Sequence, residues 1–549
     1  MRRTGIFFLT FLLTTTLSCT PKGVGVTYPA PPARQAKIVD SYGAGFLMVD
    51  GKRRLIHVKG TPYEMGFQYG YLLEKDLVNI VATLETMLAS QSIPGHLSGP
   101  IAVFASTLFR PYIPADVMNE IRGMLAGARH RNPMTSLLEH ELIFLNCLID
   151  FGAVLQLTSI NCTGMAVWGS RTQGGKVFQT RNVDLFIGTG LEKYPIVAIH
   201  KPDGKIPYAN AGWVGFLGCV TGLNGHGLGI SQVWAKSTDR QFGKPWPLIT
   251  RQIMQEGIGV ADAVRLIGGE PKRTYGCNFI FADRGDGRGG QPAGVAIEMT
   301  ANHFASFKDN DPREYQALWN GQNYNVTIPE AVFRGDCALD PKIRSKNIFS
   351  NGPTGDPRTA KAYKSRYKGQ ADRILAHQRS QTLMGQAEAE QLSRQVAMPK
   401  CSLQCAVMNN TDLKLWVSNS RIDSNGTVYP ASKETYHFYD FDHYVPRTDL
   451  TVTGQVFRPG DTIPCTLATG NLGTARKLDL HFYLDIAGIK CAVGKRLGVN
   501  YTRSSPGTLN IPIRLPLLIP IGKGHLIVDA MLAGTNQLVD SDAVEIRTH

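Results

Sequence analysis

The chain has 549 residues, of which 43% are hydrophobic and 19% are charged, so it is long enough to form two domains with packed cores. Its formal net charge is +14 at pH 7. This excess of cations does not indicate nucleic-acid binding, because the sequence has no recognition module and no basic repeat with interleaved aromatic residues. We therefore expect no nucleic-acid partner.

The N-terminal residues predict export. Residues 1–18 combine a short basic segment, an apolar run and a small final residue, which is typical of a signal peptide. The four residues that end at Cys19 are similar to a bacterial lipoprotein cleavage box, so we expect Cys19 to carry lipid and residues 19–35 to form a tether. No later stretch is long and apolar enough for a membrane span, so a lipid anchor is the membrane contact that we expect. These features place the protein in the cell envelope, lipid-anchored in the periplasm or on the outer surface, or outside the cell.

Helices are predicted in the first third of the chain. A glycine-punctuated segment, residues 60–70, leads into the first helix, and residues 115–129 and 135–151 form two more. The pattern then changes to strands joined by hairpin turns. Among these, residues 276–283 and 294–298 predict one hairpin. The intervening residues 285–290 fit Gly-x-Gly-x-x-Gly, but no helix follows them, so they do not indicate a dinucleotide site.

The most informative motif begins just after the predicted helices. Residues 161–164 read Asn-Cys-Thr-Gly, and residues 181–184 read Arg-Asn-Val-Asp. The residues between them predict a strand, a turn at Thr-Gln-Gly-Gly and a returning strand. This hairpin would bring Arg181 and Asp184 back beside Cys162.

From about residue 445 the chain consists of short alternating strands separated by turn residues. We therefore expect residues 446–549 to form an immunoglobulin-like β-sandwich that serves as an accessory domain. The predicted strands are residues 450–456, 478–484, 509–515, 526–531 and 543–547.

The motif at Cys162 and the order of the other motifs resemble the N-terminal nucleophile (Ntn) hydrolases, in their penicillin acyltransferase-like and choloylglycine hydrolase-like cysteine branch. The resemblance covers approximately residues 60–444. It implies an α+β fold, a four-layer αββα sandwich over residues 36–445. It also implies that the precursor cuts itself after Asn161, so that a leader ends there and a catalytic fragment begins at Cys162. Asn161 departs from the glycine or aspartate that often precedes the cut.

The resemblance gives each motif residue a task. Cys162 is the nucleophile, and its freed α-amino group, with an ordinary pKa of roughly 7.7–8.0, is the base. Arg181 favours the thiolate, and Asp184 holds the new amine. Asn224 and Asn278 are the candidates for the oxyanion hole, where one amide donor contributes about 3–4 kcal/mol. We expect neither a cofactor nor a metal.

The predicted activity is that of a self-processing amidohydrolase or acyltransferase. It would cleave linear amide bonds of N-acylated small molecules through a thioester at Cys162, and the two fragments would stay associated. Three alternatives stay open: an ester-cleaving phospholipase B-like enzyme of the same fold, a non-catalytic envelope scaffold or binding lipoprotein, and a papain-like pair of Cys162 with His226.

Two further expectations concern cysteines and cations. Cys465 with Cys491, and then Cys401 with Cys405, are the candidates for disulfide bonds. Seven cations between residues 358 and 379, Arg366 among them, are interpreted as a solvated helix face, with attraction to anionic envelope surfaces or acidic substrates as the alternative.

Overall fold

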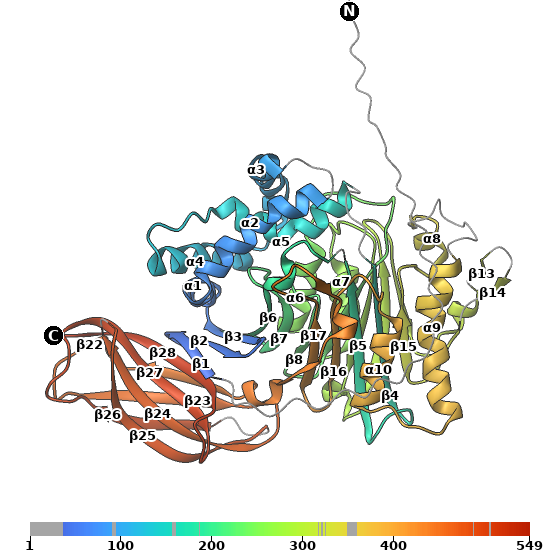
Figure 1. Ribbon diagram of the computed structural model, residues 1–549. Coiled ribbons are helices and arrows are strands. Elements are labelled where there is room, and N and C mark those ends of the chain that lie inside the picture. The colour runs from blue at the N-terminus through green and yellow to red at the C-terminus, as the bar shows by residue number, and fades with distance from the viewer. Residues whose placement is uncertain are drawn as a thin grey trace, which may run out of the picture. The chain divides into compact units, whose positions relative to one another are not determined.

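The computed structural model describes residues 37–90, 95–155, 161–185, 187–316, 318–319, 322–323, 326–348, 360–486, 488–503 and 507–549. The predicted signal peptide, Cys19 and the tether lie outside the described residues. The described residues belong to one compact unit, and its helices and strands confirm the mixed α/β class (Figure 1).

Two large sheets form the framework. One has ten strands in the order β1-β2-β3-β6-β7-β8-β9-β10-β11-β12, and the other has six in the order β15-β4-β5-β16-β17-β20. Neighbouring strands are antiparallel except for β3 and β6, which are parallel. The ten strands are β1 (Lys37–Tyr42), β2 (Gly45–Asp50), β3 (Arg53–Gly60), β6 (Pro195–Pro202), β7 (Tyr208–Trp213), β8 (Thr221–Asn224), β9 (Gly229–Trp234), β10 (Cys277–Asp283), β11 (Ala293–Met299) and β12 (Phe304–Lys308). The six are β15 (Ala331–Arg334), β4 (Asn161–Gly169), β5 (Gly175–Asp184), β16 (Ser402–Asn409), β17 (Lys414–Asn419) and β20 (His437–Asp440).

The two sheets pack face to face through β4 and β9. Ala166 of β4, Val233 of β9 and Ile280 of β10 share one buried hydrophobic cluster. Gly164 allows the close approach, because a Cβ atom there would lie 3.0 Å from the Ser231 side chain and 3.1 Å from that of Ile280. The predicted hairpin after residue 161 is therefore confirmed as β4 and β5, and it lies in the interior of the molecule.

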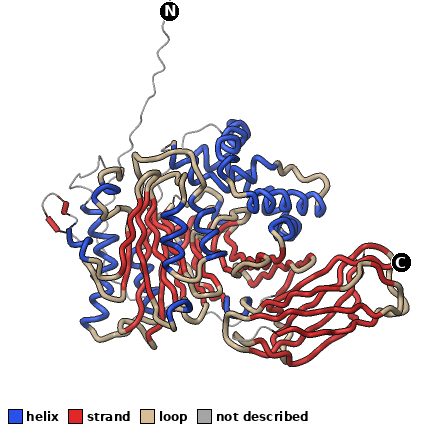
Figure 2. The backbone as a smooth tube through the Cα atoms, turned by 180° about the vertical axis from the view of Figure 1, so that it is seen from behind, coloured by secondary structure: helices blue, strands red, loops and turns tan. Residues whose placement is uncertain are grey.

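Helices cover the outer faces of both sheets (Figure 2). Helices α6 (Trp246–Glu256) and α7 (Val260–Gly269) contribute to the same apolar cluster as β9 and β10 of the ten-stranded sheet. Helices α9 (Ala360–Arg379) and α10 (Gln386–Val396) pack on β4, β5 and β16 of the six-stranded sheet. This order of helix, sheet, sheet and helix is the one that the αββα prediction requires.

The three predicted leader helices are present as α1 (Pro62–Leu72), α4 (Ala115–Arg131) and α5 (Glu139–Val154), and α1 packs on α4 through glycines. Two more that were not predicted from the sequence, α2 (Glu74–Ser90) and α3 (Ser98–Phe109), lie between α1 and α4 in the chain. Gly66 and Gly70 of α1 face α4, and Gly123 and Gly127 of α4 face α1. A Cβ atom at any of these four positions would overlap a backbone carbonyl oxygen of the other helix. The glycine punctuation noted in the sequence thus permits direct contact between two helix backbones.

The C-terminal strands form two sheets around a separate apolar core. One has the order β21-β23-β26 and the other β22-β28-β27-β24-β25. Their bounds are β21 (Arg447–Val452), β22 (Val456–Phe457), β23 (Thr462–Gly470), β24 (Arg476–Ile486), β25 (Ile489–Tyr501), β26 (Gly507–Arg514), β27 (Gly522–Leu532) and β28 (Leu538–Thr548). The immunoglobulin-like topology and the boundary at residue 445 stay predictions. The remaining short elements are β13 (Leu318–Trp319), β14 (Gln322–Asn323), α8 (Pro341–Arg344), β18 (Arg421–Ile422) and β19 (Val428–Tyr429).

The predicted disulfide bonds are absent from the structure. All nine cysteines in the described part of the chain are free thiols. Cys465 lies in β23 and Cys491 in β25, which belong to opposite sheets of the sandwich. The Cys465 side chain points into the core, where it packs as a small apolar group. Cys405 is likewise buried in a core, away from the half-buried Cys401.

Candidate functional site

Cys162 lies at the start of β4, which pairs with β5. In the β4–β5 pair, Asn161 lies opposite Asp184 and Gly164 lies opposite Arg181. The Cys162 side chain is completely buried. The hairpin therefore holds the thiol in the interior and delivers the two charged residues of the second motif to the same end of the strand pair.

Arg181 is the cation that faces the thiol. Its Nη2 lies 3.9 Å from the Cys162 Sγ and also donates to Gln232 Oε1 at 3.1 Å. Its Nε donates to the Gln232 carbonyl oxygen and its Nη1 to Thr221 Oγ1. Gln232 and Thr221 belong to β9 and β8, so the ten-stranded sheet fixes the guanidinium that the six-stranded sheet carries. The sequence motif gave no sign of these two partners.

Burial governs the protonation of Cys162. It raises the pKa of the thiol to about 11, although the Arg181 guanidinium acts in the opposite direction. The thiol is therefore neutral at pH 7 in the uncut chain. A thiolate in this position requires a base that removes the proton, or a change in the surroundings of the sulfur.

Asp336 contacts the backbone of the nucleophile. The Cys162 N–H donates to Asp336 Oδ1 at 2.7 Å. Burial raises the pKa of Asp336 to about 6, against the effect of the Arg366 guanidinium, whose Nε lies 3.2 Å from Asp336 Oδ2. One fifth of the Asp336 side chain still reaches solvent. The Asp336 carboxyl therefore changes its charge just below neutral pH. It accepts a hydrogen bond from the nitrogen that a cut after Asn161 would free.

Asp184 has other partners. Its carboxylate pairs with Arg366, and its Oδ1 accepts the Met398 N–H at 3.0 Å. Arg366 thus bridges Asp184 and Asp336. Asp184 lies near the proposed cut, but Asp336 accepts the hydrogen bond from the Cys162 nitrogen. The assignment of the amine to Asp184 stays a prediction, and Asp336 is the residue with the direct hydrogen bond.

The interpretation of the basic segment is wrong for Arg366. Its side chain is only 9% exposed and lies between two carboxylates. Helical spacing alone could not distinguish this face of α9 from a solvated one, because the acids that bury Arg366 come from distant parts of the chain. Asp336 gave no signal either, since it follows a strand of four residues and lies 174 positions from Cys162.

Asn278 lies beside the Asp336 loop. Its Nδ2 donates to the carbonyl oxygens of Gly335 and Cys337 at 3.0 and 2.8 Å. Its Oδ1 is buried without a hydrogen-bond partner among the described residues. The side chain therefore clamps both neighbours of Asp336. A role in the oxyanion hole stays a prediction, and both amide donors of Asn278 are engaged in this structure.

Asn224 is engaged in a turn. Its Nδ2 donates to the carbonyl oxygens of Met254 and Gly257, and its Oδ1 accepts the N–H groups of His226 and Leu228. It lies three residues beyond Thr221 in β8, about 10 Å along the strand. Both ends of the Asn224 amide are therefore engaged by backbone groups, and a role in the oxyanion hole stays a prediction.

His226, the alternative base of a papain-like pair, has its own carboxylate partner. Its Nδ1 lies 3.0 Å from Asp286 Oδ2. The two residues hold together the turns that follow β8 and β10. Nothing in this arrangement directs the imidazole to Cys162. Among the described residues, no three His, Cys, Asp or Glu side chains gather as metal ligands.

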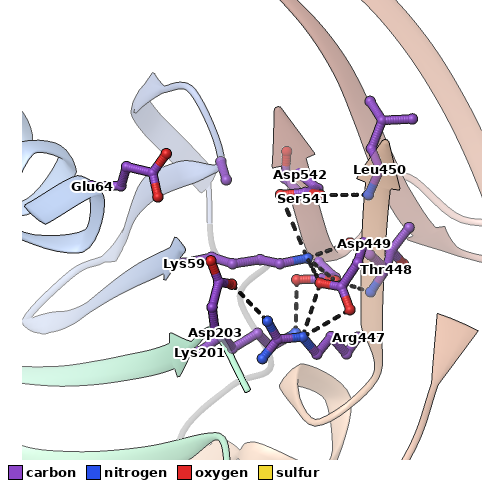
Figure 3. Close-up of polar contacts among 12 residues, drawn as sticks. Lys59, Glu64, Lys201, Asp203, Arg447, Thr448, Asp449, Leu450, Ser541 and Asp542 are labelled. Carbon is purple, nitrogen blue, oxygen red and sulfur yellow. Dashed lines mark hydrogen bonds and ion pairs between the residues drawn. The ribbon is translucent and has the colours of Figure 1, made fainter. Parts of the chain in front are cut away.

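A second buried charge cluster joins the C-terminal sandwich to the ten-stranded sheet (Figure 3). Asp540 of β28 is fully buried and lies 2.8 Å from Lys201 Nζ and 3.4 Å from Lys59 Nζ. It also accepts the Thr448 N–H at 2.6 Å. Burial opposes its charge, yet the two ammonium groups hold the pKa of Asp540 well below its usual range. Asp449 lies 3.2 Å from Lys59, which completes the balance at the edge of the cluster.

Comparisons with known proteins give distant relatives. No protein-family model matches the chain. An uncharacterized protein of Archaeoglobus fulgidus is 24% identical over 272 residues, which are 46% of this chain and 44% of that protein. Proteins dcd1B and dcd1A of Dictyostelium discoideum are each 24% identical, over 40% and 48% of this chain and 46% and 62% of their own lengths. The chain spans roughly half the length of these curated relatives.

Two solved structures are also similar. One is a Caenorhabditis elegans ortholog of N-acylethanolamine-hydrolyzing acid amidase, with 14% identity and a TM-score of 0.29 over 46% of this chain and 93% of that one. The other is a mutant of the conjugated bile acid hydrolase from Clostridium perfringens, with 12% identity and a TM-score of 0.29 over 51% and 96%. Likeness at this level assigns neither a family nor an activity to the chain.

Proposed function

We propose that the chain is a self-processing cysteine hydrolase that cuts itself between Asn161 and Cys162 and then cleaves linear amides of N-acylated small molecules. The observation that carries this proposal is the hydrogen bond from the Cys162 N–H to Asp336 Oδ1, at 2.7 Å. It joins the nitrogen of the bond to be cut to a carboxyl with a pKa of about 6, while Arg181 faces the thiol of the same residue.

The first reaction is an acyl shift from nitrogen to sulfur. The Cys162 sulfur attacks the carbonyl carbon of Asn161, the C–N bond breaks, and a thioester forms. The thiol proton moves to the departing nitrogen by way of the Asp336 carboxyl, whose pKa near 6 suits both acceptance and donation. Water then cleaves the thioester, leaving an Asn161 carboxylate and a free thiol on Cys162.

The second reaction uses the new N-terminus. The α-amine takes the thiol proton, the thiolate attacks the substrate amide, and the protonated amine gives its proton to the leaving nitrogen. Arg181 stabilises the thiolate, and Asp336 holds the ammonium group. Water resolves the acyl-enzyme in a hydrolase, and an amine resolves it in a transferase. Export and a lipid anchor at Cys19 complete the proposal for the whole protein.

The test is the intact mass and the N-terminal sequence of purified protein. We expect wild type to yield two fragments, the larger beginning Cys-Thr-Gly-Met, and Cys162→Ala to stay whole. Cys465→Ala is the matched control, because it removes another buried free thiol far along the chain and should leave the cut intact. A wild-type protein that remains a single chain would overturn self-processing.

The substrate class is tested on the processed protein. Turnover of N-acyl amino acids, bile-acid conjugates and β-lactam side-chain amides is compared with turnover of phospholipids and simple esters. Amide turnover that disappears in Cys162→Ala supports the proposal. Exclusive turnover of phospholipid would favour the phospholipase B-like alternative, and an intact function without Cys162 would favour a scaffold.

A further inference from the structure

One end of the C-terminal sandwich exposes large aliphatic side chains. On the loop between β26 and β27, Leu517 is 77% exposed, Leu518 is 93% exposed and Ile521 is 72% exposed. Ile519 of the same loop packs against the sandwich core. The partly buried Ile519, together with buried Leu515, anchors the loop, while Leu517, Leu518 and Ile521 face solvent. A group of exposed aliphatic residues on a fixed loop typically marks an interaction site.

Two more exposed aliphatic residues come from other segments at this end. Val456 is 56% exposed and pairs with Arg547 of β28, which in turn pairs with Lys523, two residues after Ile521. Ile489 is 55% exposed and begins β25 opposite the end of β24, which pairs with Gly524 of β27. The apolar tip is defined as the following five residues: Val456, Ile489, Leu517, Leu518 and Ile521.

Cations surround the apolar tip. The segments that build it, residues 455–461, 488–490, 514–523 and 545–549, contain five lysines and arginines but two acids. All five cations are exposed, and the list is Arg458, Lys490, Arg514, Lys523 and Arg547. Of the acids, Asp461 accepts the Arg458 backbone N–H, and Glu545 lies 3.6 Å from Lys523 Nζ. Lys490 Nζ lies 3.3 Å from Asp529 Oδ2, outside these segments, so among the described residues the other four cations have no such carboxylate or one that is itself exposed. The tip therefore has an apolar centre with a cationic surround.

We propose that the apolar tip inserts into the surface of a lipid bilayer that carries anionic headgroups. Aliphatic side chains of this kind enter the boundary between headgroups and acyl chains, to a depth of about 5–10 Å. Lysine and arginine around them then meet the negative surface. Pro516 and Pro520 restrict the loop, which lowers the entropy lost on insertion. No helix in the described part of the chain is long and apolar enough to cross a membrane.

The proposal is independent of the chemistry at Cys162, because it rests on a different part of the chain. It also differs from a lipid anchor at Cys19, since the contact is made by side chains of the folded sandwich. A weak side-chain contact and a lipid chain together hold a protein on a membrane more firmly than either does alone.

Vesicle binding tests the proposal. The full chain carrying Cys19→Ser is mixed with vesicles of phosphatidylcholine alone or with 30% phosphatidylglycerol, a composition chosen to give about a third of the lipids a negative charge. We expect Leu517→Asp with Leu518→Asp to weaken flotation with the anionic vesicles at least tenfold. The matched control is Leu497→Asp, at a site that is 61% exposed near the other end of β25.

A local probe separates tip contact from contact elsewhere. Leu518→Trp and Leu497→Trp each add one indole at an exposed site, and anionic vesicles should shift the emission of the first to shorter wavelength but not that of the second. An unchanged emission for Leu518→Trp overturns the proposal. So does a change of oligomeric state in the Asp variants without any effect on vesicles, since a second copy or a protein partner would then be the occupant.

Discussion

Two buried charge clusters in this molecule differ in how well their charges are balanced. At the junction with the sandwich, Asp540 faces two ammonium groups and a backbone N–H, and its pKa lies well below the usual range. At the site, burial dominates instead, so the pKa of Asp336 rises to about 6 and that of the Cys162 thiol to about 11.

The two clusters therefore suit different roles, one structural and the other catalytic. Asp540 keeps its charge through the physiological range, so it can hold two parts together without exchanging a proton, although burial lowers the pKa of Lys201 beside it to about 8 and raises that of Asp542 at the edge to about 6. An unbalanced cluster contains groups that gain or lose protons near neutral pH, which acid–base catalysis requires. Substitutions at either cluster test this difference.

The largest effect is expected from Asp540→Asn. The substitution keeps the shape but leaves Lys201 and Lys59 without the carboxylate between them, which costs about 3–5 kcal/mol of unfolding free energy. Urea unfolding at pH 7 measures the loss. Asp449→Asn is the control, because this side chain is 41% exposed and its pairs are screened by solvent. Equal effects of the two substitutions would contradict the importance of the buried carboxylate.

The next effect is expected from Asp336→Asn. Asparagine can still accept the Cys162 N–H but cannot take up a proton, so self-cleavage should slow by about 100-fold. Because the pKa of Asp336 is about 6, the wild-type rate should rise as the pH passes from 5 to 7, and the variant should lack this step. Gel-based time courses at each pH give the rates.

The same pH experiment on Asp184→Asn tests whether Asp184 or Asp336 is the partner of the Cys162 nitrogen. If Asp336 is the partner of the Cys162 nitrogen, the Asp184 variant should retain the pH step near 6 and lose less activity. Loss of the step in Asp184→Asn, with a normal profile in Asp336→Asn, would return the amine to the residue that the sequence motif indicates.

A third buried carboxyl, Asp150, tests the energetic side of the comparison. Burial raises its pKa to about 7, against hydrogen bonds from the Thr274 hydroxyl and the Trp246 N–H. Between pH 4 and 7 the folded protein therefore keeps a proton that the unfolded chain has lost, and stability falls as the pH rises. Asp150→Asn should remove this fall and recover about 2 kcal/mol at pH 8 relative to pH 5. Thermal unfolding at both pH values measures the effect. An equal change of stability between pH 5 and pH 8 in wild type and Asp150→Asn would contradict the prediction.

The smallest effect compares the two candidate oxyanion residues. Asn278→Ala releases the loop that carries Asp336 and should slow self-cleavage about tenfold, or roughly 1.4 kcal/mol. Asn224→Ala removes four side-chain hydrogen bonds, against two for Asn278→Ala, but in the turn that follows β8. It should lower the urea midpoint without changing the cleavage rate of the folded protein. Equal slowing by both would show that rigidity alone matters.

The sequence could predict what is local. Alternating apolar residues and a turn motif give the β4–β5 hairpin, and the hairpin gives Arg181 its place 3.9 Å from Cys162 Sγ. The contact between Cys162 and Asp336 depends on β15 joining the edge of the same sheet, which no local pattern encodes. The burial of Arg366 could not be predicted for the same reason, because its acidic partners lie 182 and 30 positions earlier in the chain.

Glycines illustrate a different limit. Gly66 with Gly70 and Gly123 with Gly127 are each four residues apart in the sequence, which alone gives no physical reason for the spacing. The structure supplies the reason, because side chains there would collide with the carbonyl groups of the facing helix. A spacing of four residues within each helix predicts small side chains on one face, but only the fold tells which other helix they meet.

The parallel pairing of β3 with β6 has a consequence for the processed protein. The residues before the proposed cut supply β1, β2 and β3 to the ten-stranded sheet, and six paired positions from Leu55 to Gly60 join them to the rest. After cleavage the protein is a heterodimer of two polypeptides. Its stability then obeys mass action, so that thermal unfolding becomes dependent on protein concentration. Two separately expressed halves should also reconstitute the sheet when they are refolded together.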